Sequence, residues 1–191
     1  MTLSYADAAA QITAPGERYE THEITVNGVT YTAFKGAPGT LRELFDLTTL
    51  YGDTEYLVYE DERYTFTEVH AHAAGLAAAL VNRYGVRKGD RVAIAMRNYP
   101  EWIMTYVGAL AAGAIVVSMN AWWTAEELDY GLEDSGTTVL VADAERVAHA
   151  IPDHPGPRLQ HQHHQLLAVQ RRRYGARGRR PGVERRRPLR A

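Results

Sequence analysis

Cysteine is absent from the 191 residues. Without thiols, the chain can form neither a disulfide framework nor a thiolate metal site, and a reducing cytoplasm is compatible with its composition. The first residues carry no basic segment followed by an apolar run, and no apolar stretch continues uninterrupted for the length of a membrane span. We therefore read neither a signal peptide nor a transmembrane helix, and we expect a cytoplasmic protein of about one domain.

Basic residues are scarce before residue 154 and abundant after it. Residues 1–153 carry 10 basic and 22 acidic side chains, a net charge of −12, whereas residues 154–191 carry 11 basic side chains and 1 acidic side chain, a net charge of +10. Apolar periodicity also stops near residue 151, where prolines, glutamines and histidines lead into arginine blocks. We therefore expect a folded domain over residues 1–150 and a disordered tail over residues 151–191.

All 11 basic residues of the tail are arginines. Out-of-frame translation of a GC-rich gene is enriched in arginine codons. A frameshift is therefore the favoured explanation for the arginine-rich end. The alternative is a non-catalytic binding module whose tail, with arginine blocks at residues 171–173 and 185–187, neutralises nucleic-acid phosphates. Tyr174 is the only aromatic residue of the tail, which offers little base stacking, and the preceding domain is acidic. Specific nucleic-acid binding is therefore disfavoured.

Two β-hairpins are expected in the N-terminal half. Apolar and polar side chains alternate over residues 24–31 about Asn27 and Gly28, a dipeptide typical of a type I′ turn. Residues 56–59 form the first strand of a second hairpin, which turns through residues 60–63 into residues 64–66.

Capping patterns predict two helices in the same half. Thr40 with Glu43 precedes a short amphipathic helix that reaches about residue 50. Thr65 with Glu68 starts a longer helix of apolar residues at helical spacing, and Gly85 can supply the left-handed residue that ends it.

Strands and helices alternate from residue 91 onward. Because the strands are short, apolar and separated by helices, they are best placed side by side in a parallel sheet with right-handed crossovers. The fold class is therefore α/β, a partial parallel sheet of βαβαβ order preceded by β-hairpins. The expected elements are strands at residues 91–96, 115–119 and 138–141, with helices at residues 100–112 and 124–135.

Seven strings of residues keep a definite order and spacing through the α/β region. They are YTF at residues 64–66, GVRKGDRVAI at 85–94, RNYPEW at 97–102, GALAAGA at 108–114, NAWWTAEEL at 120–128, DSG at 134–136 and VLVAD at 139–143. The likeness covers about residues 20–148. In this order the strings resemble the N-terminal subdomain of AMP-forming acyl-CoA synthetases.

The resemblance implies a large adenylating domain and a small mobile C-terminal domain, with ATP, Mg²⁺ and CoA used by intact relatives. In the family reaction, ATP activates a carboxylic acid to an acyl-adenylate, which then gives acyl-CoA and AMP. The acid is taken to be a fatty acid from the likeness alone. Most of that machinery lies beyond this sequence, so we expect a truncated, inactive fragment with no catalytic, cofactor-binding or metal-binding residue of its own.

Residues 135–138, Ser-Gly-Thr-Thr, copy the first four residues of the family's phosphate loop, Ser-Gly-Thr-Thr-Gly-x-Pro-Lys. Such a loop surrounds a triphosphate with backbone N–H groups and hydroxyls. Here Val139-Leu140-Val141 follows where the loop needs Gly and then Pro-Lys. We interpret residues 135–138 as the exit of a helix, with Gly136 as its stop, into a buried strand.

Other candidate sites are weaker. The histidine cluster lies largely in the tail and lacks the fixed geometry of a metal site, while His70 and His72 are expected at the surface or boundary of a helix. The acidic groups are expected to be solvated faces because neighbouring side chains point apart. The clustered residues are His149, His154, His161, His163 and His164, and the acidic groups are 60–62, 126–127 and 133–134.

The Trp122-Trp123 pair has two interpretations. One indole could lie near an acyl-binding surface or an oligomer contact. The favoured interpretation places one ring in the core and the other over the start of the following helix.

Overall fold

The structure is a computed structural model, which describes residues 3–150 and 165–169. At its centre is a parallel sheet with the strand order β6-β5-β7-β8. All three strand pairs of this sheet are parallel. The strands are β5 (Arg91–Ala95), β6 (Ile115–Ser118), β7 (Thr137–Asp143) and β8 (Gln165–Val169).

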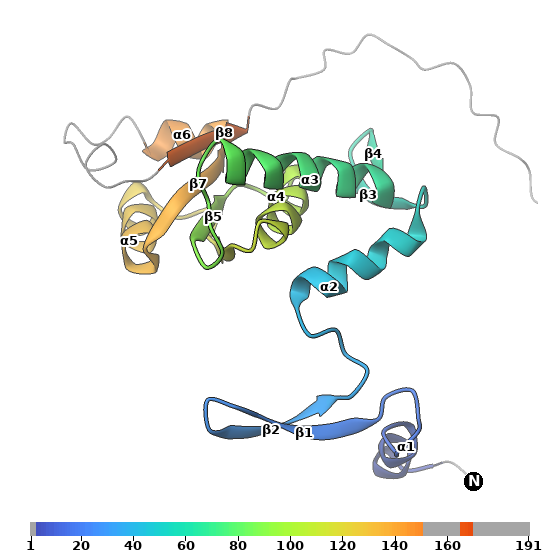
Figure 1. Cartoon of the computed structure of the whole chain (residues 1–191). Coiled ribbons are helices and arrows are strands. Elements are labelled where there is room, and N and C mark those ends of the chain that lie inside the picture. The colour runs from blue at the N-terminus through green and yellow to red at the C-terminus, as the bar shows by residue number, and fades with distance from the viewer. Residues whose placement is uncertain (1–2, 151–164, 170–191) are drawn as a thin grey trace, which may run out of the picture.

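Helices cover both faces of the sheet (Figure 1). Side chains of β5 and β7 that point to one face pack with α3 and α4, and those that point to the other face pack with α5 and α6. This arrangement confirms the predicted α/β class, because only a sheet covered on both faces has near-continuous apolar strands. The helices are α3 (Phe66–Asn82), α4 (Pro100–Ala111), α5 (Ala125–Ser135) and α6 (Ala144–Ala150).

The two faces of the sheet differ in the size of their side chains. Val92 and Ile94 of β5 pack against α3 and α4 together with Leu80, whereas Ala93 and Ala95 face α5. Val92, Ile94 and Leu80 are completely inaccessible to solvent. Alternation of large and small residues along one strand lets α5 approach the sheet closely while the α3–α4 side is filled by larger aliphatic groups.

A glycine allows the two helices of the larger core to approach each other. Gly108 of α4 lies against α3, and a Cβ atom built on it would be 2.8 Å from the Ala73 carbonyl oxygen and 3.2 Å from Leu76 Cβ. Any larger residue at this position would push α4 away from α3.

Helix ends follow the sequence predictions. Thr65 of α3 and Thr124 of α5 each form a complete capping box with a glutamate three residues later. For Glu127 the hydrogen bonds from the Thr124 backbone and hydroxyl lower the pKa of the carboxyl. Pro100 occupies the first turn of α4, and Gly136 ends α5 with φ 61°, as expected from the positions of these residues.

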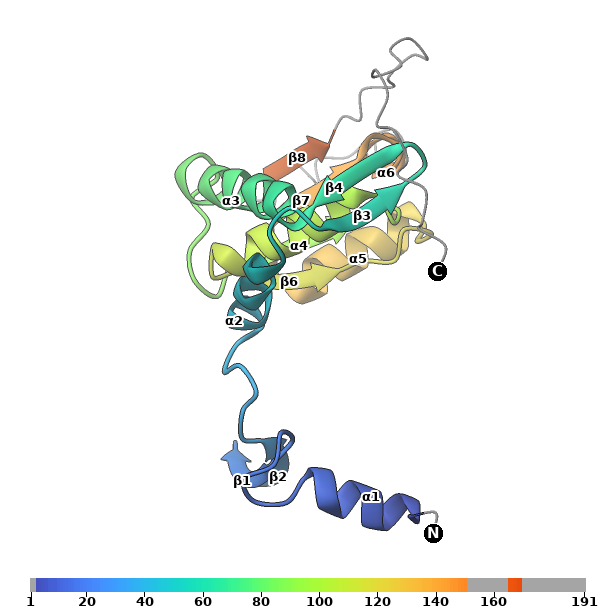
Figure 2. The ribbon, with the colours of Figure 1, turned by 90° about the vertical axis from the view of Figure 1, so that its right-hand side faces the viewer.

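Residues 3–35 form an arm that stands apart from the α/β unit in both Figure 1 and Figure 2. The arm contains α1 (Tyr5–Ile12) and a hairpin of β1 (Thr21–Val26) and β2 (Val29–Phe34). Asn27 and Gly28 both have positive φ, which confirms the predicted turn. Lys35 closes the hairpin by an ion pair to Glu20 at 2.8 Å, and this hydrogen bond lowers the pKa of the Glu20 carboxyl.

A helical segment and a second hairpin connect the arm to the α/β unit. Phe45 contacts Tyr106 of α4 edge to face at 6.0 Å, and Arg42 Nη1 donates to the Ala111 carbonyl at 3.2 Å, so this helical segment is anchored on α4. The connecting elements are α2 (Leu41–Asp46), the 3-10 helix η1 (Leu47–Tyr51), β3 (Glu55–Tyr59) and β4 (Glu62–Thr65).

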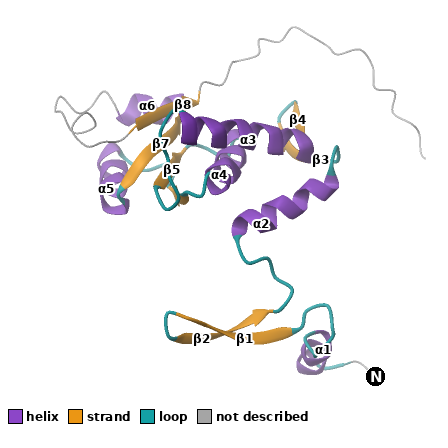
Figure 3. Cartoon of the chain, viewed as in Figure 1, coloured by secondary structure: helices purple, strands orange, loops and turns teal. Residues whose placement is uncertain are grey.

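Three features differ from the sequence expectations (Figure 3). Helix α1 was not expected. The second hairpin turns more tightly than expected because Glu60 adopts a left-handed conformation, φ 49°, so β4 already begins at Glu62. Residues 165–169 were expected to be disordered, but they form β8, paired in register with β7.

The error over residues 165–169 has a physical reason. Local periodicity cannot identify a five-residue apolar strand whose hydrogen bonds come from a distant neighbour. The remaining residues of the expected tail, 151–164 and 170–191, lie outside the described part of the chain. Within the described part, no helix is both long and apolar enough to cross a membrane.

Candidate functional site at the carboxyl edge of the sheet

The connections of the sheet reverse direction at β5. The chain leaves β5 through α4 to reach β6 on one side, and then returns through α5 to β7 on the other side. Open α/β sheets bind ligands beside the carboxyl ends of strands at such a reversal. Arg97 and Trp122 follow the carboxyl ends of β5 and β6, and Asp143 is the last residue of β7. These three residues come together in the structure.

Asp143 is the centre of this cluster. Its side chain is 6% exposed, and it accepts hydrogen bonds from the backbone N–H of Arg97 at 3.0 Å and from that of Arg146 at 2.8 Å. The guanidinium of Arg146 lies 3.3 Å from the same carboxylate. Asp143 therefore ties the loop after β5 to the start of α6 across the reversal point.

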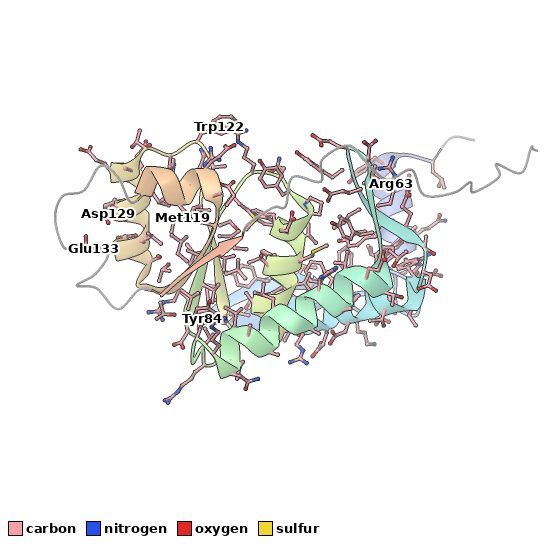
Figure 4. The ribbon with its side chains drawn as sticks, turned by 90° about the horizontal axis from the view of Figure 1, so that it is seen from above. Arg63, Tyr84, Met119, Trp122, Asp129 and Glu133 are labelled. Atoms are coloured by element: carbon pink, nitrogen blue, oxygen red, sulfur yellow. The ribbon has the colours of Figure 1, made fainter. Side chains whose placement is uncertain are left out.

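Two arginines flank an exposed indole beside Asp143. The Cζ atom of Arg97 lies 5.0 Å from the ring centroid of Trp122, and that of Arg146 lies 5.9 Å from it. Glu145 pairs with both guanidinium groups, at 3.0 Å to Arg97 and 3.1 Å to Arg146. The ring itself is 75% exposed, and Figure 4 shows Trp122 at the rim of the α/β unit.

The cluster offers a flat apolar surface bordered by positive charge. Arg97 Nε is buried and has no hydrogen-bond partner within the described residues, so one strong donor of the cluster is unused by the protein. Guanidinium groups and aromatic rings together suit planar or anionic ligands. The cluster contains no nucleophile paired with a base, so the geometry supports binding and orientation rather than covalent catalysis.

An apolar groove lies near this edge, beside the first turn of α4. Its volume is about 350 Å³, and it opens between the second hairpin and α4. Tyr59 and Tyr99 meet there edge to face at 5.6 Å. The groove is lined by Leu57, Val58, Tyr59, Asn98, Tyr99, Pro100, Trp102 and Ile103.

Residues 135–138 lie at the opposite edge of the sheet, at the start of β7. Ser135 ends α5 and its hydroxyl lies 2.8 Å from that of Thr137, while the Thr138 hydroxyl donates to the Arg91 carbonyl at 3.1 Å. A Cβ atom on Gly136 would lie 2.9 Å from Arg91 Nη2. The hydroxyls are committed to the protein and the strand follows directly, which confirms the interpretation as a helix-to-strand connection.

The favoured interpretation of the tryptophan pair is wrong. Neither ring lies in the core, because Trp122 is 75% exposed and Trp123 is 39% exposed. Trp123 instead covers α5 at Gly131, where a Cβ atom would lie 2.7 Å from Trp123 Cζ3. The sequence could not place the rings because the partners of Trp122, Arg97 and Arg146, are distant in the chain.

The histidines and acidic groups stand largely as expected. His70 is half-buried and its Nε2 lies 2.8 Å from the Thr48 hydroxyl, and His72 is exposed. The acidic residues at 60–61, 126–127 and 133–134 are exposed, and Figure 4 shows Glu133 on α5. Glu62 is instead half-buried and accepts a hydrogen bond from the Tyr64 hydroxyl at 2.9 Å. Within the described residues no three His, Asp or Glu side chains gather as a metal site would require.

Four of the five clustered histidines cannot be placed. His149 belongs to α6, whereas His154, His161, His163 and His164 lie outside the described residues, as do the arginine blocks. The residues that the sequence did not single out are Arg97, Asp143 and Arg146. The signal that could have found them is their position, since Arg97 lies two residues after β5, Asp143 ends β7, and Arg146 is one helical turn after Asp143.

Comparisons with known proteins agree with this architecture. The family model described as AMP-binding enzyme matches residues 46–180. The long-chain-fatty-acid–CoA ligase of Salmonella typhimurium is 37% identical over 102 residues, which are 53% of this chain and 18% of that protein. The Bacillus subtilis protein of the same name is 36% identical over 98 residues, 51% of this chain and 17% of that protein.

A solved structure shows the same fold. An anthranilate CoA ligase in complex with anthranoyl-AMP superposes with a TM-score of 0.60 at 25% identity, over 67% of this chain and 24% of that one. The chain thus spans about a fifth of the length of the curated relatives that it matches. Because the family model covers well over half of the residues, the chain belongs to the AMP-binding enzyme family.

Proposed function

We propose that this chain is the N-terminal subdomain of an ATP-dependent fatty-acid–CoA ligase. The observation that supports this most is the family match over residues 46–180, which coincides with a sheet whose connections reverse at β5. In the intact enzyme the reaction would join a carboxylate to AMP and then transfer the acyl group to CoA. A fatty acid is the proposed substrate because relatives from Salmonella typhimurium and Bacillus subtilis carry that name.

The carboxyl edge of the sheet would face the substrates in the intact ligase. Ligands of open α/β sheets lie at this edge, and Arg97, Arg146 and Trp122 provide positive charge and an exposed ring there. These residues would orient an anionic part of a nucleotide substrate, with ATP, Mg²⁺ and CoA supplied as in the family. Their role is binding, because no group of the cluster is placed to attack or to move a proton.

The 191 residues alone are proposed to be inactive. The family's phosphate loop needs Gly and then Pro-Lys after Ser-Gly-Thr-Thr, and residues 139–141 continue instead as a buried strand. Without groups that surround the triphosphate, the transition state for adenylation lacks its main electrostatic stabilisation.

The test is isotope exchange between pyrophosphate and ATP in the presence of fatty acids of several lengths. We expect a rate no higher than that of a buffer control, under conditions in which a full-length long-chain-fatty-acid–CoA ligase exchanges readily. A fatty-acid-dependent rate above the control would show that the chain adenylates by itself.

The origin of residues 151–191 is also a proposal. We propose that residues 1–150, with strand β8 added to their sheet, form the subdomain, and that a frameshift in the codons that follow β8 produced the arginine-rich end. Sequencing the DNA around these codons tests this directly. A single-base correction should open a reading frame that encodes the missing phosphate loop. If no other reading frame of this DNA encodes such a loop, the proposal is contradicted.

A further inference from the structure

The Glu145 carboxylate bridges two guanidinium groups at the carboxyl edge of the sheet. A single oxygen, Oε2, lies 3.0 Å from Arg97 Nη2 and 3.1 Å from Arg146 Nη1. The Glu145 side chain is 53% exposed, so the position of this oxygen is open to solvent on one side. Guanidinium groups that converge on one anionic oxygen also suit a phosphate oxygen of a ligand. Glu145 thus occupies the place where such a ligand would bind to this pair.

Both arginines are held in place by contacts other than Glu145. Arg146 is buried, and its Nη1 lies 3.3 Å from Asp143 Oδ2. The Arg97 backbone N–H donates to the same carboxylate at 3.0 Å, and its Cζ lies 5.0 Å from the ring centroid of Trp122. The two guanidinium groups would therefore stay together if the Glu145 side chain rotated outward into solvent.

The charges of this cluster balance only while Glu145 is in place. The carboxylates of Asp143 and Glu145 face the guanidinium groups of Arg97 and Arg146, so outward rotation of Glu145 leaves one positive charge uncompensated. A phosphate group restores the balance and brings more acceptor oxygens than a carboxylate. Ion pairs of half-exposed side chains contribute little net stability, so the exchange of Glu145 for a phosphate costs the protein little.

We infer that Glu145 is an internal competitor, whose carboxylate takes the place of a ligand phosphate between Arg97 and Arg146 and moves out when that phosphate binds. The inference rests on the proposed function, which assigns the anionic part of a nucleotide to this cluster, and it adds a residue that regulates the binding. Glu145 does not contact the bound phosphate. It lowers the apparent affinity of every anion by the same factor, because only the fraction of molecules with Glu145 turned outward can bind.

Titration of the full 191-residue chain with inorganic phosphate tests the inference at neutral pH and constant ionic strength. Glu145→Gln keeps the shape of the side chain and removes its charge. We expect this variant to bind phosphate about tenfold more tightly than the unmodified chain, because a negative charge a few ångströms from the phosphate is removed. Calorimetry measures the affinity, and the fluorescence of Trp122, whose ring lies beside both arginines, reports binding at this cluster.

Glu55→Gln is the matched control. Glu55 is 58% exposed and pairs with Arg63 at 3.5 Å, so this variant has the same change in net charge and loses the same kind of ion pair at a distant place. Its phosphate affinity should stay within about twofold of that of the unmodified chain. Arg97→Gln added to Glu145→Gln should abolish the gain, which separates this cluster from the arginines at residues 171–187. Circular dichroism checks that every variant is folded.

Equal phosphate affinity of the unmodified chain and Glu145→Gln, or no binding by either, would overturn the inference. Weaker binding by Glu145→Gln would overturn it too, because Glu145 would then hold the arginines in place for the ligand. AMP, which carries a phosphate on a planar base, is the second probe. Tighter binding of AMP than of phosphate to Glu145→Gln supports a nucleotide as the ligand. Equal binding of the two would leave the role of Glu145 standing and count against the nucleotide of the proposed function, so the two claims can fail separately.

Discussion

The α/β unit and the N-terminal arm follow the same local rules but differ in what covers them. In the α/β unit, the apolar residues of β5 are completely buried between helices on two faces. In the arm, an equally regular apolar alternation over β1 and β2 stays half exposed. Sequence pattern thus determines which face of an element is apolar, and only long-range packing determines whether that face is buried.

Removal of Asp143 should have the largest effect on the α/β unit. Asp143→Ala would leave the buried guanidinium of Arg146 without its one buried carboxylate partner and would free two backbone N–H groups. We expect the free energy of unfolding to fall by about 3 kcal/mol. Urea unfolding followed by circular dichroism measures it. Glu145→Ala is the matched control, because that side chain is 53% exposed, and a loss there as large as that for Asp143→Ala would contradict this account.

Gly108 and Gly75 provide a matched pair within the helices. Gly108→Ala places a methyl group 2.8 Å from the Ala73 carbonyl, so α4 must move, and we expect destabilisation by about 1 to 3 kcal/mol. Gly75→Ala on α3 meets no atom within 4 Å and should stabilise by up to about 1 kcal/mol, because alanine favours helix. Thermal melts of both variants measure these changes in stability. The same sign of effect in both would mean that α3 and α4 are not closely packed.

Removal of helix caps should give smaller changes in stability, and these also distinguish the two regions. Thr124→Ala removes the capping box of α5 and should lower the stability of the α/β unit by about 1 kcal/mol. Ser4 caps α1, because its hydroxyl accepts a hydrogen bond from the Asp7 N–H at 3.2 Å. Ser4→Ala removes this cap and should change only the local helicity of the arm. A shift of the global urea midpoint by Ser4→Ala equal to that by Thr124→Ala would show that the arm and the α/β unit unfold together.

The sequence predicted the elements with strong local signals and missed those held by distant partners. Capping boxes, Pro100 and the Asn27-Gly28 turn identified helices and a hairpin because each depends on residues a few positions apart. Strand β8 depends on hydrogen bonds to β7, and its residues carry no turn or cap signal. It was therefore assigned to a disordered tail.

The candidate site was missed for the same reason. Arg97 and Trp122 come from the loops after β5 and β6, and Asp143 ends β7; no spacing in the sequence reports that these segments meet. The predicted fold nevertheless indicated where a site would lie, since the order of strands and helices implies a reversal point at the carboxyl edge of the sheet. Residues 135–138 were correctly set aside, because the apolar residues that follow them are a local signal for a strand.

Hydrogen exchange of the backbone amides, followed by mass spectrometry, tests the contrast between the two regions most directly. Amides of β5 and β7 should be protected for hours, whereas those of β1 and β2 should exchange within seconds. Equal protection of the hairpin and the sheet would contradict the account.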